Sequence, residues 1–196
     1  APVFYLLADP NGAGKSTLYK NLAQDGVIHA SAEFVNADIY ESMYLQHIPD
    51  LSARSLAARN WADARRALLL MQKQSFASET VFSHESKLAL IDEARRAGFL
   101  VMLLIVAMDD TKRLVARVKQ RVSEGGHNVP KERILARYPR TLANLNLAIG
   151  KAHVAMLYDS DERKHKAHEL IAICQDGHVL EQVQDLPQWA KTVLGI

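Results

Sequence analysis

Hydrophobic positions along the chain alternate between short apolar runs and longer stretches with helical spacing. Val3 to Ala8 is an apolar run that ends in a cluster of Pro, Asn and Gly. From Lys15 a helical pattern follows, with Leu18 and Leu22 on one side. This order predicts a strand, a loop and a helix. Further strands are predicted at 34–37, 76–82, 99–108, 154–158, 170–173 and 179–183, and further helices at 38–46, 52–74, 84–97, 111–123, 131–151 and 186–194.

The alternation of strands and helices determines the expected fold class. Residues 99–108 are apolar throughout, which is typical of a strand that is buried on both faces of a parallel sheet. We therefore expect a three-layer α/β fold with a mostly parallel sheet of five or six strands. No repeat or flexible linker marks a second domain, so residues 1–196 are predicted to form a single domain in which 111–150 is a helical lid subdomain.

Composition excludes several classes of protein. With 48% hydrophobic and 23% charged residues in 196, the chain is neither disordered nor fibrous. Its longest apolar run, 99–108, is about half of the roughly 20 residues that cross a bilayer, so no membrane span is expected. The single cysteine, Cys174, excludes an internal disulfide. Since no basic segment precedes the first apolar run either, we expect a cytoplasmic protein.

Positive charge is concentrated in one segment. Residues 111–140 carry nine basic and two acidic side chains, a local net charge of +7 in a chain whose total is +2. This distribution favours a segment that faces an anion. The alternative is a solvated helical face, which is the more common origin of a basic run considered alone.

The segment ADPNGAGKST, Ala8 to Thr17, lies between the first predicted strand and helix, where a phosphate-binding loop belongs. Glycines allow backbone N–H groups to turn around a phosphate, and the start of the helix adds unpaired donors and the positive end of its dipole. The alternative is a Gly-rich turn that only connects strand to helix. We predict a nucleotide site made of Asn11, Gly12, Ala13, Gly14, Lys15, Ser16 and Thr17.

Individual side chains of this loop have predicted roles. Lys15 is expected to reach the β- and γ-phosphates of ATP or GTP, and the Ser16 hydroxyl to complete the shell of a Mg²⁺ ion. The consensus GxxxxGK[ST] has glycine where this chain has Asp9. An inward carboxylate would repel phosphates and weaken nucleotide binding. Because Pro10 and Asn11 suit a turn, we expect the loop to form with Asp9 directed outward.

Acidic residues at strand ends are candidates for proton transfer. Asp38 follows the second predicted strand, and Glu79 and Thr80 lie in the third. Ligands of open α/β sheets bind at the carboxyl edge of the strands, so Asp38 is the predicted general base for a substrate hydroxyl, and Glu79 with Thr80 is predicted to orient the substrate. Alternatively, Asp38 caps the following helix and Glu79 pairs with an arginine. Asp109 and Asp110 are expected to cap a helix rather than to bind Mg²⁺.

Arginines line one side of each lid helix. At 100° per residue, Arg113, Arg117 and Arg121 fall within about 80° of one another, and Arg133, Arg137 and Arg140 within about 60°. Two such ridges, joined by a loop that contains Gly125, Gly126 and His127, can close over a triphosphate and neutralise charge in the transition state. The alternative is that these arginines are solvated or pair with surface acids. Pro139 is expected to bend the second helix.

Other metal chemistry is not indicated. The eight histidines show no HExxH or paired ligand spacing. His165, His168 and Cys174 are therefore predicted to be surface or core residues.

Several motifs together resemble the zeta toxin family of phosphate-loop kinases in its short, single-domain form. They are PNGAGKST, FVNAD, SFASETVFS, RVSEGGHNVPKERILARY and YDS, which span residues 3 to about 160. The resemblance implies a P-loop kinase-like fold with five parallel strands and phosphorylation of a UDP-amino sugar by ATP or GTP. It also implies an antitoxin protein as a possible partner.

By the same resemblance, Lys15 matches the phosphate-loop lysine of the family, Asp38 its base, and Glu79 with Thr80 its substrate contacts. The first lid arginine corresponds to Arg117 or Arg121 and the second to Arg133 or Arg137; we expect Arg121 and Arg137 to be catalytic and Arg117 and Arg133 to bind substrate. One alternative is a nucleotide-binding regulatory protein whose catalysis Asp9 has impaired. A nucleic-acid kinase is disfavoured because Tyr138 is the only aromatic residue in the basic segment.

Overall fold

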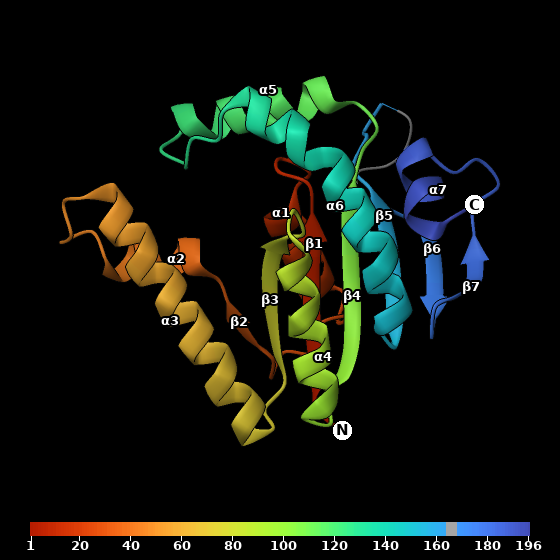
Figure 1. The fold of residues 1–196 in the computed structure, drawn as a ribbon, viewed down its shortest axis with the longest axis horizontal. Coiled ribbons are helices and arrows are strands. Elements are labelled where there is room, and N and C mark those ends of the chain that lie inside the picture. Colours follow the sequence, from red (N-terminus) through yellow and green to blue (C-terminus); the bar gives the residue numbers. More distant parts are fainter. Residues whose placement is uncertain (164–167) are drawn as a thin grey trace.

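Seven strands form one sheet in the order β2-β3-β1-β4-β5-β6-β7 (Figure 1). The structure is a computed structural model that describes residues 1–163 and 168–196; the predicted role of His165 lies outside the described residues. The parallel strands are β1 (Val3–Asp9), β2 (Glu33–Val35), β3 (Phe76–Val81), β4 (Leu100–Ala107) and β5 (Val154–Asp159), and the antiparallel strands are β6 (Glu169–Gln175) and β7 (His178–Gln182).

The predicted fold class is confirmed, but the predicted number of five or six strands is too low. Both strands of the C-terminal hairpin extend the sheet beyond β5. Asp176 and Gly177 join them with φ of +49° and +81°, as a two-residue hairpin turn of the twist-matched kind requires. The five parallel strands that the family resemblance implies are all present.

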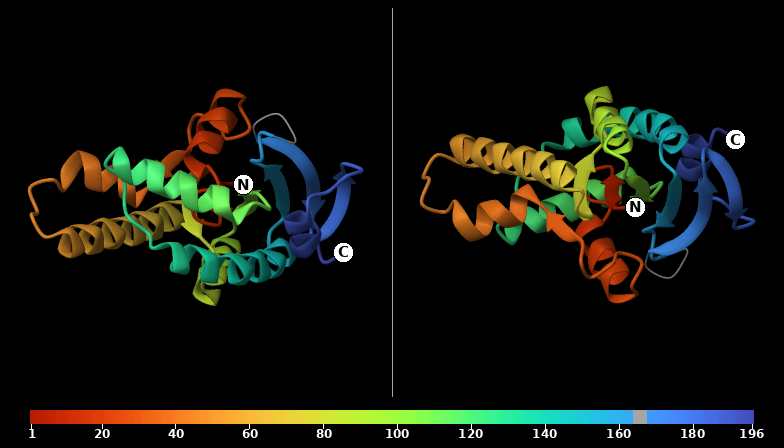
Figure 2. Two further views of the ribbon diagram at one scale, coloured as in Figure 1. Left: turned by 90° about the horizontal axis from the view of Figure 1, so that it is seen from above. Right: turned by 90° about the horizontal axis from the view of Figure 1, so that it is seen from below.

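Helices cover both faces of the sheet (Figure 2). α1 lies on one face and α4 and α6 lie on the other, while α5 crosses above the carboxyl ends of the strands (Figures 1 and 2). No helix within 1–163 and 168–196 combines the length and apolarity that a membrane crossing requires. The helices are α1 (Lys15–Gln24), α2 (Ala37–Tyr44), α3 (Leu51–Gln72), α4 (Leu88–Arg96), α5 (Thr111–Ser123), α6 (Lys131–Lys151) and α7 (Gln188–Leu194).

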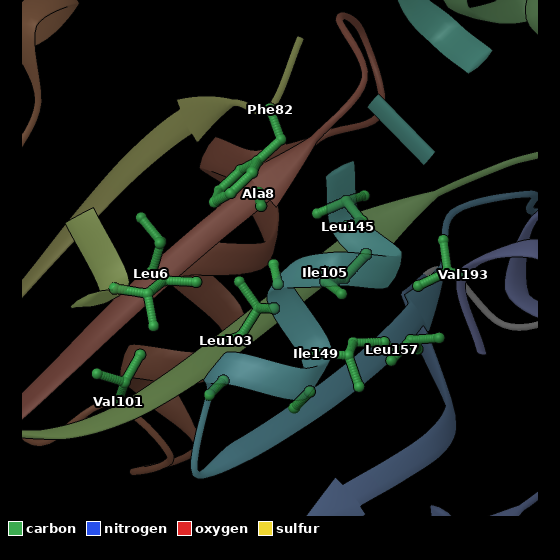
Figure 3. Packing of buried hydrophobic residues seen from close by; sticks show 14 of the residues in the cluster. Leu6, Ala8, Phe82, Val101, Leu103, Ile105, Leu145, Ile149, Leu157 and Val193 are labelled. Carbon is green, nitrogen blue, oxygen red and sulfur yellow. The ribbon is translucent and has the colours of Figure 1, made fainter. Parts of the chain in front are cut away.

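Side chains of the central strands alternate between two hydrophobic cores, one on each face of the sheet. Leu6 and Leu103 point to the face that α6 covers, where they pack with Leu145 and Ile149 (Figure 3). Their neighbours in sequence point to the other face and pack against α1. Each buried side chain of this size stabilises the fold by roughly 1.5–3 kcal/mol. This packing holds the central strands in place and so determines where the loops at their carboxyl ends begin.

The lid helices are anchored at their ends. Asp110 caps α5 by accepting hydrogen bonds from the backbone N–H groups of Lys112 and Arg113, as predicted. Asp109 instead accepts hydrogen bonds from the first N–H groups of α7. Pro139 lies inside α6, and the helix changes direction along its length (Figure 1). The lid thus crosses the sheet edge with α5 and descends along one face with α6.

Candidate functional site

The loop between β1 and α1 has the backbone of a phosphate cradle. Gly12 and Gly14 have φ of +85° and +98°, which disfavours any residue with a Cβ. Space imposes the same requirement, because a Cβ at Gly12 would lie 2.6 Å from the carbonyl oxygen of Leu114 in α5 and one at Gly14 would lie 2.9 Å from Nε2 of His168. Within the described residues, the buried Oδ1 of Asn11 has no hydrogen-bond partner. The loop therefore has the backbone shape for an anionic ligand, while the free Oδ1 of Asn11 is an acceptor that can take a hydrogen bond only from a donor such as water.

Asp9 points inward, so the expectation that it is directed outward is wrong. Its side chain is 2% exposed, and Oδ1 accepts a hydrogen bond from Nζ of Lys15 at 2.5 Å. The reason is the strand register: Asp9 is the last residue of β1 and follows Tyr5 and Leu7 to the face that α1 covers. Its φ is not among the positive ones, so this position does not need glycine for backbone conformation.

Several charged groups act on the ion pair of Asp9 and Lys15. Burial raises the pKa of Asp9 to about 6, although Lys15 opposes the rise, and the carboxylate of Glu79 adds to it. Burial lowers the pKa of Lys15, but Asp9 and Glu79 outweigh it and hold that pKa above its ordinary value. Arg121, at the far end of α5, lowers the pKa of both groups. The mouth of the loop thus brings together two acids, the lysine and one lid arginine.

The buried carboxyl of Asp9 predicts a pH dependence of stability. The folded state holds its proton up to pH of about 6, whereas the unfolded chain releases it near 3.8. Stability is therefore lost as the pH rises through this window, by up to roughly 3 kcal/mol in the free energy of unfolding. Urea denaturation of the wild type and of Asp9→Asn from pH 3.5 to 7.5 gives the difference between their free energies of unfolding at each pH. The contributions of the other acids are common to both proteins and cancel in this difference. Parallel profiles would contradict it.

Glu79 and Thr80 do not share a face. Successive residues of β3 alternate, and Glu79 pairs in register with Leu7 on the α1 side, whereas Thr80 pairs with Ala8 on the other. The buried Oε2 of Glu79 has no hydrogen-bond partner among the residues described. The structure therefore brings Glu79 to the loop and leaves Thr80 on the opposite face of the sheet.

Asp38 is free of a capping role. Asn36 caps α2 instead, since its Oδ1 accepts hydrogen bonds from the N–H groups of Asp38 and Ile39 at 2.9 and 3.2 Å. The alternative that Asp38 caps the helix is therefore wrong. Its side chain is 70% exposed in the first turn of α2, where it is available to a ligand.

The lid arginines divide into two groups. Arg113 pairs with Asp161 at 3.2 Å, and Arg117 donates to the carbonyl oxygen of Ser160 and lies 3.6 Å from Glu162, so both are held against the segment after β5. A second group forms no ion pair within the part of the chain described. Three of its members lie on α6, where burial lowers the pKa of Arg137 and the charges of Arg133 and Arg140 lower it further. The second group is Arg121, Arg133, Arg137 and Arg140.

Like charges that share a face without acidic partners favour an anionic ligand over solvation alone, because mutual repulsion must be offset. The three arginines of α6 have this property. Arg117, predicted to bind substrate, is occupied instead by the carbonyl oxygen of Ser160 and the carboxylate of Glu162.

One contact of the lid was not predicted. Nε2 of His127, in the loop between α5 and α6, lies 2.6 Å from Oε2 of Glu41 and 3.6 Å from Oδ1 of Asp38, both in α2. Donor atoms of the three residues lie within 4.8 Å of one another, a spacing that also suits a metal ion. The sequence motif that contains His127 indicated a hinge but gave no signal for its partner.

The remaining predicted residues lie around the loop. Ser16 and Thr17 are exposed at the start of α1, where a hydroxyl can meet a hydrated cation. His168 lies over Gly14, and burial lowers its pKa. With Leu18 and Tyr158 it lines a cavity of about 500 Å³ beside α1. Cys174 is buried in the core, as predicted.

Comparison with known proteins identifies a family whose sequence model matches most of the chain. A sequence model of the family described as "Zeta toxin" matches residues 1–165. No curated protein matches the chain.

Solved structures share the fold. A chain of the AvrRxo1-ORF1 and AvrRxo1-ORF2 complex with sulphate ions is similar with a TM-score of 0.74 and 18% identity, over 98% of this chain and 63% of that one. The same complex with ATP gives 0.71 and 18%, over 97% and 61%. A structure from the PezAT toxin–antitoxin system of Streptococcus pneumoniae gives 0.59 and 14%, over 85% and 73%. The chain thus spans less than two thirds of the AvrRxo1 chains.

Proposed function

The chain belongs to the zeta toxin family, and on that premise we propose that it transfers the γ-phosphate of ATP or GTP to a hydroxyl of a small molecule, a UDP-amino sugar. The observation that carries the proposal is the meeting of Lys15, in a loop built for phosphate, with the charge of Arg121 from the lid. Two cations from opposite sides of one opening suit a chain of phosphates.

Each group then has a chemical task. Backbone N–H groups around Gly12 and Gly14 and the ammonium of Lys15 hold the phosphates. The Ser16 hydroxyl would hold Mg²⁺, which would neutralise negative charge on the phosphates. Asp38 accepts the proton of the acceptor hydroxyl as the hydroxyl oxygen attacks the γ-phosphorus, and the bond from that phosphorus to the β–γ bridging oxygen breaks, so that ADP or GDP leaves. Arg121 and Arg137 stabilise the transferring group. The cavity beside α1, lined by Tyr158 and His168, has room for the nucleoside.

The activity is tested by incubating the protein with ATP or GTP, Mg²⁺ and a panel of nucleotide sugars, followed by mass spectrometry. A product that carries one additional phosphoryl group on the sugar supports the proposal. If nucleotide binds in calorimetry but no acceptor is phosphorylated, the alternative of a nucleotide-binding regulatory protein takes its place. Absence of binding at millimolar nucleotide would contradict both.

The Asp9–Lys15 ion pair is the reason to retain that alternative. A phosphate must displace the carboxylate from Lys15 before it can bind there, and the buried negative charge of Asp9 repels it. We therefore expect Asp9→Gly to raise the affinity for Mg-ATP at pH 7.5 by at least about tenfold, or roughly 1.4 kcal/mol. Asp9→Asn, which keeps the size of the side chain, separates charge from volume. Calorimetry that gives equal affinities in all three proteins would exclude Asp9 as an obstacle.

A protein partner is also part of the proposal. The family description and the toxin–antitoxin system among the structural neighbours support an antitoxin that restrains the enzyme. Expression of the wild type without a partner should arrest growth, and expression of an Asp38→Asn variant should not. Growth arrest by both would show that toxicity is independent of the proposed chemistry.

A further inference from the structure

Glu41 is a buried acid whose position the proposed chemistry does not explain. Its residue exposure is only 4%, and it lies on the side of α2 that faces the lid and α3. Burial of a carboxylate is costly unless donors satisfy it. Oε1 accepts a hydrogen bond from the hydroxyl of Ser55 in α3 at 3.3 Å, and Oε2 lies 2.6 Å from Nε2 of His127. The shorter contact comes from the lid, which is distant in sequence.

The loop that carries His127 is held tightly to the end of α5. Gly125 has a φ of +94°, and the N–H of Gly126 donates to the carbonyl oxygen of Arg121 at 2.7 Å. A Cβ at Gly126 would lie 2.9 Å from that same oxygen, so the loop can fold back this closely only with glycine. Arg121 and Gly126 are therefore the ends of one tight turn, and His127 is the next residue along the chain.

The same imidazole nitrogen joins the lid to the acceptor side of the site. It lies 3.6 Å from Oδ1 of Asp38, which is one helical turn before Glu41 on α2. Figure 1 shows the α5–α6 loop above α2, far from the connections at the other end of the lid. One histidine thus connects the turn behind Arg121 with the helix that carries Asp38.

We propose that His127 is a positioning residue that fastens the lid to α2 through Glu41 and so sets Arg121 and Asp38 at a fixed separation. The inference rests on the proposed phosphotransferase function, because it assigns Arg121 to the phosphoryl group and Asp38 to the acceptor. In this proposal His127 acts on the reaction only through Arg121 and Asp38. A hydrogen bond between an imidazole and a carboxylate of this burial is among the stronger kinds.

The fastening is tested first without any substrate. Spin labels at Lys119→Cys in α5 and Asn60→Cys in α3, both exposed positions, report the distance from lid to core, while the native Cys174 is buried and does not label. We expect a narrow distance distribution in the wild type and a longer or broader one in His127→Ala. His127→Gln, whose amide nitrogen can replace Nε2 as donor, should restore the narrow distribution.

The distance measurement has a matched control variant and two results that would overturn the proposal. Asn128→Ala changes the next residue of the same exposed loop and should leave the distribution narrow. Superimposable distributions for the wild type and His127→Ala would overturn the proposal. A distribution in the wild type that broadens on addition of EDTA would also overturn it, in favour of a metal ion held by Asp38, Glu41 and His127.

The second test uses turnover with the acceptor found for the wild type. His127→Ala should lower kcat by roughly tenfold while the affinity for a non-hydrolysable ATP analogue is unchanged. Glu41→Ala should have a similar effect, and the double variant should be no slower than either single one, because both remove the same contact. Additive losses would overturn the proposal. The distance measurement decides on His127 even if no acceptor is phosphorylated, so failure of the proposed function is a separate result.

Discussion

Asp38→Asn is expected to lower kcat for phosphoryl transfer by roughly 10²–10⁴-fold, the range typical of a lost general base. The amide has the shape of the carboxylate but cannot accept the proton of the acceptor hydroxyl. Because Asn36 caps α2 and the Asp38 side chain is exposed, the substitution leaves the helix and its cap in place. Steady-state kinetics with the identified nucleotide sugar measure the loss, and calorimetry should give an unchanged affinity for nucleotide.

Asp185→Asn is the matched control, because it removes an exposed carboxylate from the connection between β7 and α7. It should have wild-type kcat. An Asp38→Asn enzyme with wild-type turnover would remove Asp38 from the mechanism. A fall in nucleotide affinity in that variant would instead place Asp38 on the donor side of the site.

Local patterns in the sequence predicted most of the fold. The helices at 111–123 and 131–151 have the predicted bounds. Each run of helical spacing is preceded by a residue that commonly marks a helix start, Asp110 for the first and Pro130 for the second. The helix predicted at 84–97 begins instead with a short 3₁₀ turn at Glu85–Lys87. All seven strands were predicted as segments, but only five or six were assigned to the sheet, because β7 is exposed along its length and has no buried face to mark it as part of the sheet.

The site was less predictable than the fold, since its decisive contacts join distant segments. The loop motif identified Lys15, but the inward turn of Asp9 depends on the register of β1 against its neighbours. Helical spacing placed Arg117 and Arg121 on one ridge, and only the packing of α5 separates them. The partner of His127 lies in another helix, and no spacing rule connects a loop histidine to Glu41.

Arg121→Ala is expected to lower kcat on the order of 10³-fold, the lower part of the range for an arginine that stabilises a transferring phosphoryl group. The side chain is exposed and forms no ion pair within the described part of the chain, so its removal should hardly affect stability. Its charge nevertheless lowers the pKa of Asp9 and of Lys15, so it lies within electrostatic range of the phosphate loop. Arg121→Lys retains the charge without the planar fork and should recover only part of the rate.

Arg117→Ala is the matched control from the same helix. Its guanidinium is bound to Ser160 and Glu162, so its loss should reduce kcat far less than the loss of Arg121. Single-turnover kinetics at saturating nucleotide separate the chemical step from product release in both variants. Equal losses would mean that the lid acts through its total charge. A larger loss for Arg117 would mean that the lid rotates on nucleotide binding and exchanges the two arginines, since a helix turn of about 40° separates these positions around α5.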